Sequence, residues 1–324
     1  MTAFRFLLLS IALCFSLAFV VACSGGGSSD DTNEVSFALS DAPIEGLDSV
    51  TITIESMTVN REGEEDIVID TFDDEDGNPL DRVTVDLLDY QGSDSKIILF
   101  DFELEIGDYQ NIRLEILDEN TDDSYVLEIG DAERKLLKVP SDQLKLGGFE
   151  VESGGAQFFV IEFNLPRSMT YNPGPDRYIL KPRGVRVVDV EAAAEVRGVA
   201  LGDLLDDCDD ADEGHANRVY LYKGHGLDAT LLGDAFDPDI DDTVPAGTIE
   251  PYASEDLDEF NAYEIGFVNA GNYTLAFSCN AAPDDADFFD DIPIPAPENQ
   301  LTEITLEAGD EQVCDFELAG VNCI

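Results

Sequence analysis

The chain has 324 residues, of which 71 are aspartate or glutamate and 17 are lysine or arginine, so its formal net charge is −54. A surface this acidic repels nucleic-acid phosphates, which excludes DNA and RNA as partners. Hydrophobic residues make up 44% of the chain, which is too many for an intrinsically disordered protein, and the length suffices for two ordinary domains.

The first 22 residues have the layout of a secretory signal peptide. Residues 4–22 are almost wholly apolar, with Arg5 as their only charge, and a small residue, Ala22, precedes Cys23. A basic start, an apolar stretch and a small residue at the cleavage site are typical of such peptides. The run is also about long enough to span a bilayer, which needs roughly 20 residues. The small residue followed by cysteine favours removal on export.

The segment Val20-Val21-Ala22-Cys23 resembles the lipobox of bacterial lipoproteins. This resemblance implies that Cys23 is acylated and becomes the first residue of the mature chain, with several acyl chains (palmitate among them) as a stable anchor. It also implies that Ser24 directs the protein to the outer membrane, with the periplasmic and cell-surface faces both open. Residues 23–33 then form a flexible Gly/Ser/Asp tether.

Residues 34–190 are expected to form a first antiparallel β-sandwich domain. Apolar residues alternate with polar ones in many short segments separated by turn residues, and this pattern is typical of sandwiches and barrels. The expected strands cover residues 50–54, 66–72, 83–88, 96–104, 111–116, 125–129, 136–139, 157–163 and 178–190.

Residues 191–324 are expected to form a second, acidic β-sandwich, which makes the whole chain all-β. After a short connector at residues 191–195, the expected strands cover residues 195–201, 218–222, 262–268, 273–278, 301–306 and 312–318. This spacing fits a sandwich of immunoglobulin or transthyretin type. The half resembles transthyretin-like and carboxypeptidase-regulatory-like modules, although the long loop at residues 224–261 departs from them.

One short motif occurs in both halves. Gly107-Asp108-Tyr109 precedes the strand at residue 112, and Gly271-Asn272-Tyr273 precedes the one at residue 275. Glycine, aspartate and asparagine tolerate tight turns, and we expect each tyrosine to pack at the start of its strand. The motif indicates fold and carries no chemistry.

Five segments, taken in order, resemble one known family of bacterial lipoprotein domains. They are Ser40-Asp41-Ala42-Pro43, Val85-Asp86-Leu87-Leu88, Gly107-Asp108-Tyr109, Val139-Pro140-Ser141 and Tyr178-Ile179-Leu180-Lys181-Pro182. The family is known as domain of unknown function 4382, and the resemblance spans about residues 34–190. It implies an exported β-rich domain behind a lipid anchor. No activity is known for the family, so it assigns no functional residue.

Four cysteines remain once the signal peptide and the lipidated Cys23 are set aside: Cys208, Cys279, Cys314 and Cys323. An even number in an exported chain predicts two disulfides, for which three pairings exist. We favour Cys208 with Cys279 and Cys314 with Cys323.

The sequence offers little for catalysis. A nucleophile activated by a base needs histidine near serine or cysteine, and the chain has only His215 and His225. Both lie in segments that read as loops, and their spacing matches no known zinc-ligand pattern. We therefore predict a protein that is not an enzyme and keep a hydrolase as a remote alternative.

Calcium is the best-supported chemical prediction. This ion binds six to eight oxygens supplied by flexible loops. Four aspartates combine alternate spacing with a position in an expected loop, so we take them as the candidate ligands. They are Asp237, Asp239, Asp241 and Asp242. The alternative is that the acid excess is a solubility device in a saline habitat. No cofactor is required by the sequence, and calcium is the one candidate.

The sequence thus predicts a non-enzymatic, lipid-anchored envelope protein that acts as a binding or structural module. Its partners are the membrane, through the anchor, and an envelope or extracellular ligand that the sequence does not name. The alternative function is a calcium-dependent adhesion or glycan-binding protein.

Overall fold

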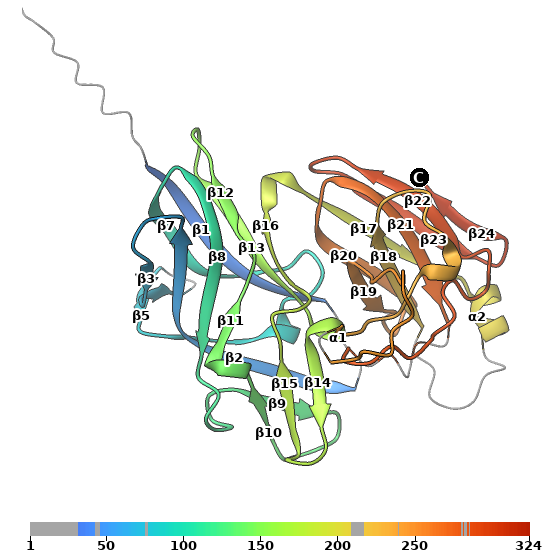
Figure 1. The fold of residues 1–324 in the computed structure, drawn as a ribbon, viewed down its shortest axis with the longest axis horizontal. Coiled ribbons are helices and arrows are strands. Elements are labelled where there is room, and N and C mark those ends of the chain that lie inside the picture. Colours follow the sequence, from blue (N-terminus) through green and yellow to red (C-terminus); the bar gives the residue numbers. More distant parts are fainter. Residues whose placement is uncertain are drawn as a thin grey trace, which may run out of the picture. The chain divides into compact units, whose positions relative to one another are not determined.

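The computed structural model describes residues 32–42, 46–74, 77–208, 217–238, 240–279, 281, 284 and 286–324. The predicted signal peptide, Cys23 and most of the tether lie outside this range. Residues 32–324 form one compact unit. We call residues 32–190 the N-terminal half and residues 191–324 the C-terminal half. Figure 1 shows their strands as two groups.

The N-terminal half places a four-stranded sheet over a larger one. The smaller sheet has the order β16-β13-β1-β7. Its members are β1 (Thr32–Ala42), β7 (Lys96–Glu105), β13 (Gln157–Asn164) and β16 (Val185–Asp189). Strand β1 lies in the middle of this sheet, parallel to β13 and antiparallel to β7.

The larger sheet has ten strands along the path β11-β8-β2-β9-β10-β15-β14, with β12 on β8 and both β3 and β6 on β2. Its members are β2 (Leu47–Arg61), β3 (Ile67–Ile69), β6 (Val83–Asp86), β8 (Gly107–Ile116), β9 (Tyr125–Glu128), β10 (Lys135–Lys138), β11 (Gln143–Lys145), β12 (Phe149–Val151), β14 (Met169–Asn172) and β15 (Arg177–Leu180). A hairpin of β4 (Phe72–Asp73) and β5 (Pro79–Leu80) stands apart. Short helices are η1 (Leu87–Asp89), η2 (Pro140–Asp142), α1 (Leu165–Ser168) and η3 (Val190–Ala192).

The core of this half lies between the two sheets. Phe37 of β1 and Phe159 of β13 come from the smaller sheet, and Ile52 of β2 and Ile112 of β8 come from the larger one. Burying apolar area of this kind is the main favourable contribution to folding. The N-terminal half therefore has its own core without any disulfide.

The C-terminal half is a second sandwich with its own core. One sheet has the order β20-β17-β23-β24 and the other β19-β18-β21-β22. The strands are β17 (Ala193–Val199), β18 (Arg218–Lys223), β19 (Ala253–Asp256), β20 (Ala262–Asn269), β21 (Gly271–Ser278), β22 (Leu301–Leu306), β23 (Glu311–Glu317) and β24 (Gly320–Cys323), with helices α2 (Gly202–Cys208) and η4 (Ala229–Leu231). Val196, Phe277 and Phe316 are buried between the sheets. The predicted all-β sandwich fold is confirmed.

Three features of the fold differ from the prediction. Strand β1 was missed, because the predicted tether ran into its start, although Val35, Phe37 and Leu39 alternate as a strand requires. The sheets are mixed, since β1–β13, β10–β15 and β17–β23 are parallel pairs. The single strand predicted at residues 178–190 is in fact β15 and β16, which belong to different sheets. Pro182 and Gly184 lie between these two strands and break the predicted single strand. The φ of Gly184 is +85°.

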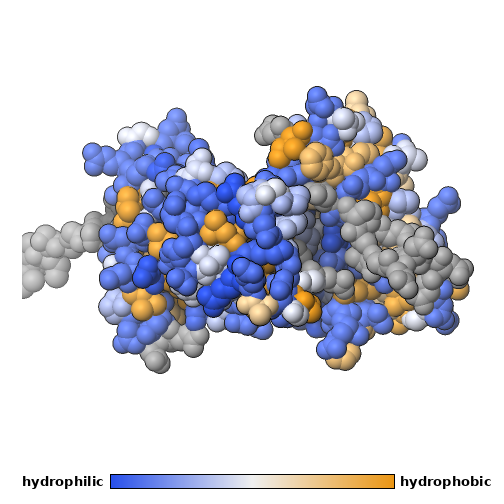
Figure 2. Space-filling view, turned by 90° about the horizontal axis from the view of Figure 1, so that it is seen from below, coloured by the Kyte–Doolittle hydropathy of each residue, from blue (hydrophilic) through white to orange (hydrophobic). Residues whose placement is uncertain are grey.

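The surface shown in Figure 2 is mostly hydrophilic, with small apolar spots scattered over it. In the described part of the chain, no helix has the length and apolar character needed to cross a membrane.

Candidate functional site

The junction between the two halves combines a buried apolar cluster with hydrogen bonds and ion pairs. Ala38, Val160 and Val188, from β1, β13 and β16, form a buried apolar cluster with Phe267 of β20. The outer face of the smaller N-terminal sheet therefore packs against the C-terminal half. This explains why β1 and β13 are buried on both faces.

Polar contacts surround this apolar patch. Arg167 of α1 donates a hydrogen bond of 2.7 Å to the carbonyl of Tyr252 and forms an ion pair with Glu250. Arg183, in the loop between β15 and β16, forms an ion pair with the same carboxylate. Asn164 donates to the carbonyl of Ser254 at 2.8 Å. One acidic side chain of the C-terminal half thus connects two arginines of the N-terminal half.

Two carboxyl groups are fully buried at the junction. Burial raises the pKa of Glu162 to about 7, although Arg186 at 3.7 Å opposes the shift. Burial likewise raises the pKa of Glu255 well above its ordinary value, and the charge of Glu162 adds to the effect. Glu255 accepts a hydrogen bond from the backbone of Glu264, and Glu264 accepts one from the backbone of Ser93 in the N-terminal half. Because these carboxyl groups are buried where the two halves pack together, their protonation state affects the stability of the junction.

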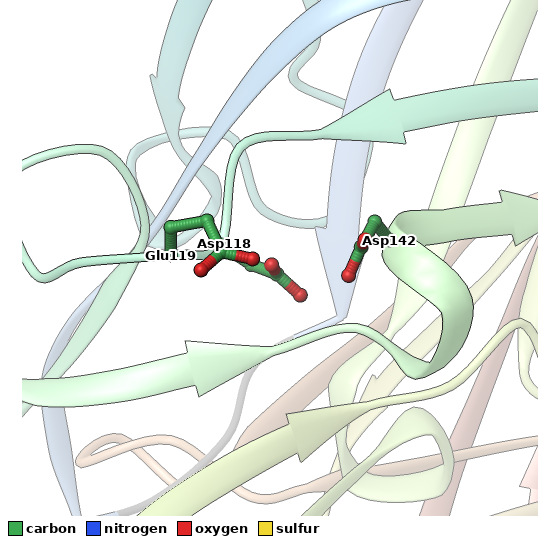
Figure 3. A group of neighbouring side chains, drawn as sticks. All are labelled: Asp118, Glu119 and Asp142. Carbon is green, nitrogen blue, oxygen red and sulfur yellow. The ribbon is translucent and has the colours of Figure 1, made fainter.

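Three acidic residues lie close enough to suggest a cation site. Ligand atoms of Asp118, Glu119 and Asp142 lie within 4.8 Å of one another, and Figure 3 shows Asp142 approaching from a different segment than the other two. The ammonium group of Lys138 lies 2.7 Å from both Asp118 and Asp142 and 3.8 Å from Glu119. Its hydrogen bonds to those carboxylates raise the pKa of Lys138. The lysine supplies the positive charge that a metal ion would bring, so this cluster is an internal ion-pair network.

The predicted calcium ligands are divided between separate interactions. Asp239 lies outside the described residues. Asp237 lies 3.8 Å from Lys181 and 3.7 Å from Arg183, both in the N-terminal half. Asp241 accepts hydrogen bonds from the backbone of Thr243 at 2.8 Å and of Phe289 at 3.0 Å. Asp242 is exposed. The calcium site stays a prediction.

The predicted disulfide between Cys314 and Cys323 is present in the structure. The two residues lie directly opposite each other on the antiparallel strands β23 and β24. Cys208 and Cys279 are both buried in the core of the C-terminal half, and their pairing stays a prediction. The lipidation site, Cys23, lies outside the described residues.

His225, the histidine among the described residues, contacts a backbone carbonyl and a carboxylate. The ring of His225 is hydrogen-bonded through Nε2 to the carbonyl oxygen of Ile304 at 2.8 Å, and Nδ1 lies 3.9 Å from Glu303. His215 lies outside the described residues.

The residues that sequence reasoning missed are the basic ones at the junction. Lys181, Arg183 and Arg186 fall within one short segment of a chain poor in basic residues, and this clustering was the available signal.

Comparison with known proteins supports the resemblance of the N-terminal half. The model of the family described as domain of unknown function (DUF4382) matches residues 32–182. This is slightly less than half of the chain and ends before β16. No curated protein matches the sequence.

The solved structures that match this chain share little sequence with it and have low TM-scores. The TIE protein of Bacillus anthracis is 8% identical, with 90% of this chain and 34% of that chain covered and a TM-score of 0.20. BcpA, the major pilin subunit of Bacillus cereus, is 6% identical, with coverages of 88% and 69% and a TM-score of 0.20. GBS52, the minor pilin of Streptococcus agalactiae, is 8% identical, with coverages of 87% and 94% and a TM-score of 0.20. The chain thus spans about a third of the TIE protein, and likenesses at this TM-score carry no argument about function.

Proposed function

We propose that this protein is a non-enzymatic lipoprotein of the bacterial outer membrane that presents a double β-sandwich as one rigid binding or structural module. The observation that carries the proposal is the junction. Its buried apolar cluster and the Arg167–Glu250–Arg183 contacts join two cores into one body. Such a body keeps a fixed geometry at the end of a flexible tether.

The anchor in this proposal is Cys23. The lipobox-like segment at residues 20–23 and the Gly/Ser-rich residues that follow favour an acylated N-terminus with a flexible connection to the body.

The experiment is metabolic labelling with a palmitate analogue in a bacterial host that processes lipoproteins, followed by membrane fractionation. Wild type should carry the label and remain with the outer membrane after a carbonate wash. Cys23→Ala should carry no label. Cys14→Ala, which changes a cysteine inside the signal peptide, should behave as wild type. Label retained by Cys23→Ala, or an unlabelled and freely soluble wild type, would disprove the anchor.

A further inference from the structure

Basic residues are concentrated at the junction. The chain has only 17 lysine and arginine residues against 71 acidic ones. Five of those cations lie on the facing segments of the two halves: Arg167, Lys181, Arg183, Arg186 and Lys223. Like charges close together repel each other, and four of these cations are compensated by carboxylates: Arg167 and Arg183 by Glu250, Lys181 by Asp237 and Arg186 by Glu162.

Three of these cations line one cavity. The cavity measures about 310 Å³ and lies between the β15–β16 side of the N-terminal half and the segment preceding β19. Its lining residues are Arg167, Gly184, Val185, Arg186, Lys223, Ile249, Glu250, Pro251 and Tyr252. This volume is at the lower end of ligand pockets, which span about 300–1,000 Å³, and suits a molecule the size of a single sugar acid.

The carboxylate side chains that line the cavity are fewer than the cationic ones. Glu250 is the one carboxylate among the described residues that line the cavity, and both Arg167 and Arg183 already bind it. Burial and the nearby charges of Arg183 and Arg186 lower the pKa of Arg167 to about 9, as expected where positive charge is crowded. The lining therefore keeps an excess of positive charge.

Arg186 and Lys223 keep some hydrogen-bonding capacity. Nη2 of Arg186 donates to the carbonyl of Gly266 at 3.3 Å and lies 3.7 Å from Glu162, whereas its buried Nε and Nη1 atoms have no hydrogen-bond partner among the described residues. Lys223 is exposed. Both cationic groups lie over the ring of Tyr252, at 4.7 Å for Arg186 and 4.5 Å for Lys223. Contacts with an aromatic ring hold a cation in place without neutralising it.

We propose that this cavity is a binding site for a small carboxylate-bearing ligand, held by the charges of Arg186 and Lys223 beside Tyr252. An ionised carboxylate supplies a negative charge beside Lys223 and further acceptors for Arg186, whose one nearby carboxylate is Glu162, and charge-assisted hydrogen bonds are the strong ones. The carboxylate comes from an acidic sugar or from a short organic acid. Both halves contribute to the cavity, so the site exists only in the joined body.

The test is isothermal titration calorimetry of the full chain at constant physiological ionic strength, because salt screens exposed charges. Glucuronate and succinate are the two carboxylate probes, glucose is the neutral counterpart of the sugar acid, and inorganic sulfate is a general anion. The key variant is Lys223→Gln, whose exposed side chain can be changed without opening the core. Lys145→Gln removes the same charge from an exposed position on β11 and is the matched control.

We expect wild type to bind at least one carboxylate in preference to glucose and sulfate. Lys223→Gln should weaken that binding about tenfold, the loss of one charge-assisted contact, and Lys145→Gln should leave it unchanged. Binding of glucuronate alone identifies an acidic sugar as the source, and binding of succinate alone identifies a short organic acid. The proposal is overturned if neither carboxylate binds, if glucose or sulfate binds equally well, or if both variants bind like wild type. These titrations do not involve the lipid anchor, so their failure would leave the proposed anchoring intact.

Discussion

Tyr109 and Tyr273 make the same hydrogen bond in the two halves of the molecule. Each tyrosine hydroxyl donates to the carbonyl oxygen four residues earlier, that of Glu105 at 3.1 Å and that of Asn269 at 2.7 Å. Both rings are buried near the starts of β8 and β21. The repeated Gly-x-Tyr motif is therefore a structural device that fixes the turn between two neighbouring strands.

Removing either hydroxyl group should destabilise the fold by a similar amount. Tyr109→Phe and Tyr273→Phe should each lower the free energy of unfolding by about 1 kcal/mol, the net value of one buried hydrogen bond. Urea titration measures this change. Tyr171→Phe is the control, because that hydroxyl is exposed and bonds to Asp176 at the surface, and it should have almost no effect. Equal losses in all three variants would argue against a specific role for the corner.

The buried carboxyl of Glu162 should make stability depend on pH. Its pKa is raised to about 7 in the folded protein by burial, whereas an unfolded glutamate titrates near 4.3. The folded state therefore holds this proton more tightly, so the contribution is fully present below about pH 4 and is lost as pH rises through 7. The arginine facing it, Arg186, and the second buried acid, Glu255, belong to the same network.

Glu162→Gln should remove that part of the pH dependence. Between pH 5 and 8 the unfolding free energy of wild type should fall more steeply than that of the variant, by a difference on the order of 3 kcal/mol. Melting curves across this range measure it. Parallel pH profiles for the two proteins would show that Glu162 does not titrate in this window.

The disulfide between Cys314 and Cys323 should stabilise the C-terminal edge of the fold. It closes a short loop, with a sequence separation of 9, for which loop-closure entropy gives about 2–3 kcal/mol. Cys323→Ser should therefore melt at a lower temperature than wild type, and a reductant should lower the melting temperature of wild type at least to that of the variant. A reductant that lowers the variant further would reveal a second disulfide, as predicted for Cys208 and Cys279.

The candidate calcium ligands predict that calcium stabilises the protein more than magnesium does at matched ionic strength, whereas the contacts that two of these ligands already make predict equal effects of the two ions. Lys181 and Arg183 face Asp237, and backbone amides occupy Asp241, so these carboxylates already have partners. A specific site would add about 2.7 kcal/mol at a hundred times its dissociation constant. A thermal melt in both salts tests this. A clear upward shift with calcium alone would favour the adhesion alternative.

The sequence was most informative where one face of a strand is buried. The alternation at Ile112, Leu114 and Ile116 correctly predicted β8, because a half-buried strand shows its period directly. Strand β1 also alternates at Val35, Phe37 and Leu39, but it was missed because the predicted tether extended over its first residues. The all-β class followed from the many short strands, whereas the parallel pairs depend on chain crossings that local patterns do not record.

The junction could not be predicted in the same way. Its contacts join residues far apart in the chain, such as Asn164 with Ser254 and Arg167 with Glu250. Nothing local in the sequence indicates which of the many acidic residues pairs with a given arginine. The excess of acidic residues led the sequence analysis to aspartate clusters, whereas the proposed binding site is built around a few basic residues.

The most direct test of this account is differential scanning calorimetry of residues 32–324, because the central claim is that the two halves form one body. Wild type should unfold in a single transition whose calorimetric and van't Hoff enthalpies agree. Glu250→Ala leaves the buried Arg167 without its carboxylate and should cost about 2 kcal/mol. Glu311→Ala removes an exposed ion pair with Arg197 and should cost less than about 1 kcal/mol. Two separate transitions in wild type, unaffected by Glu250→Ala, would contradict the claim.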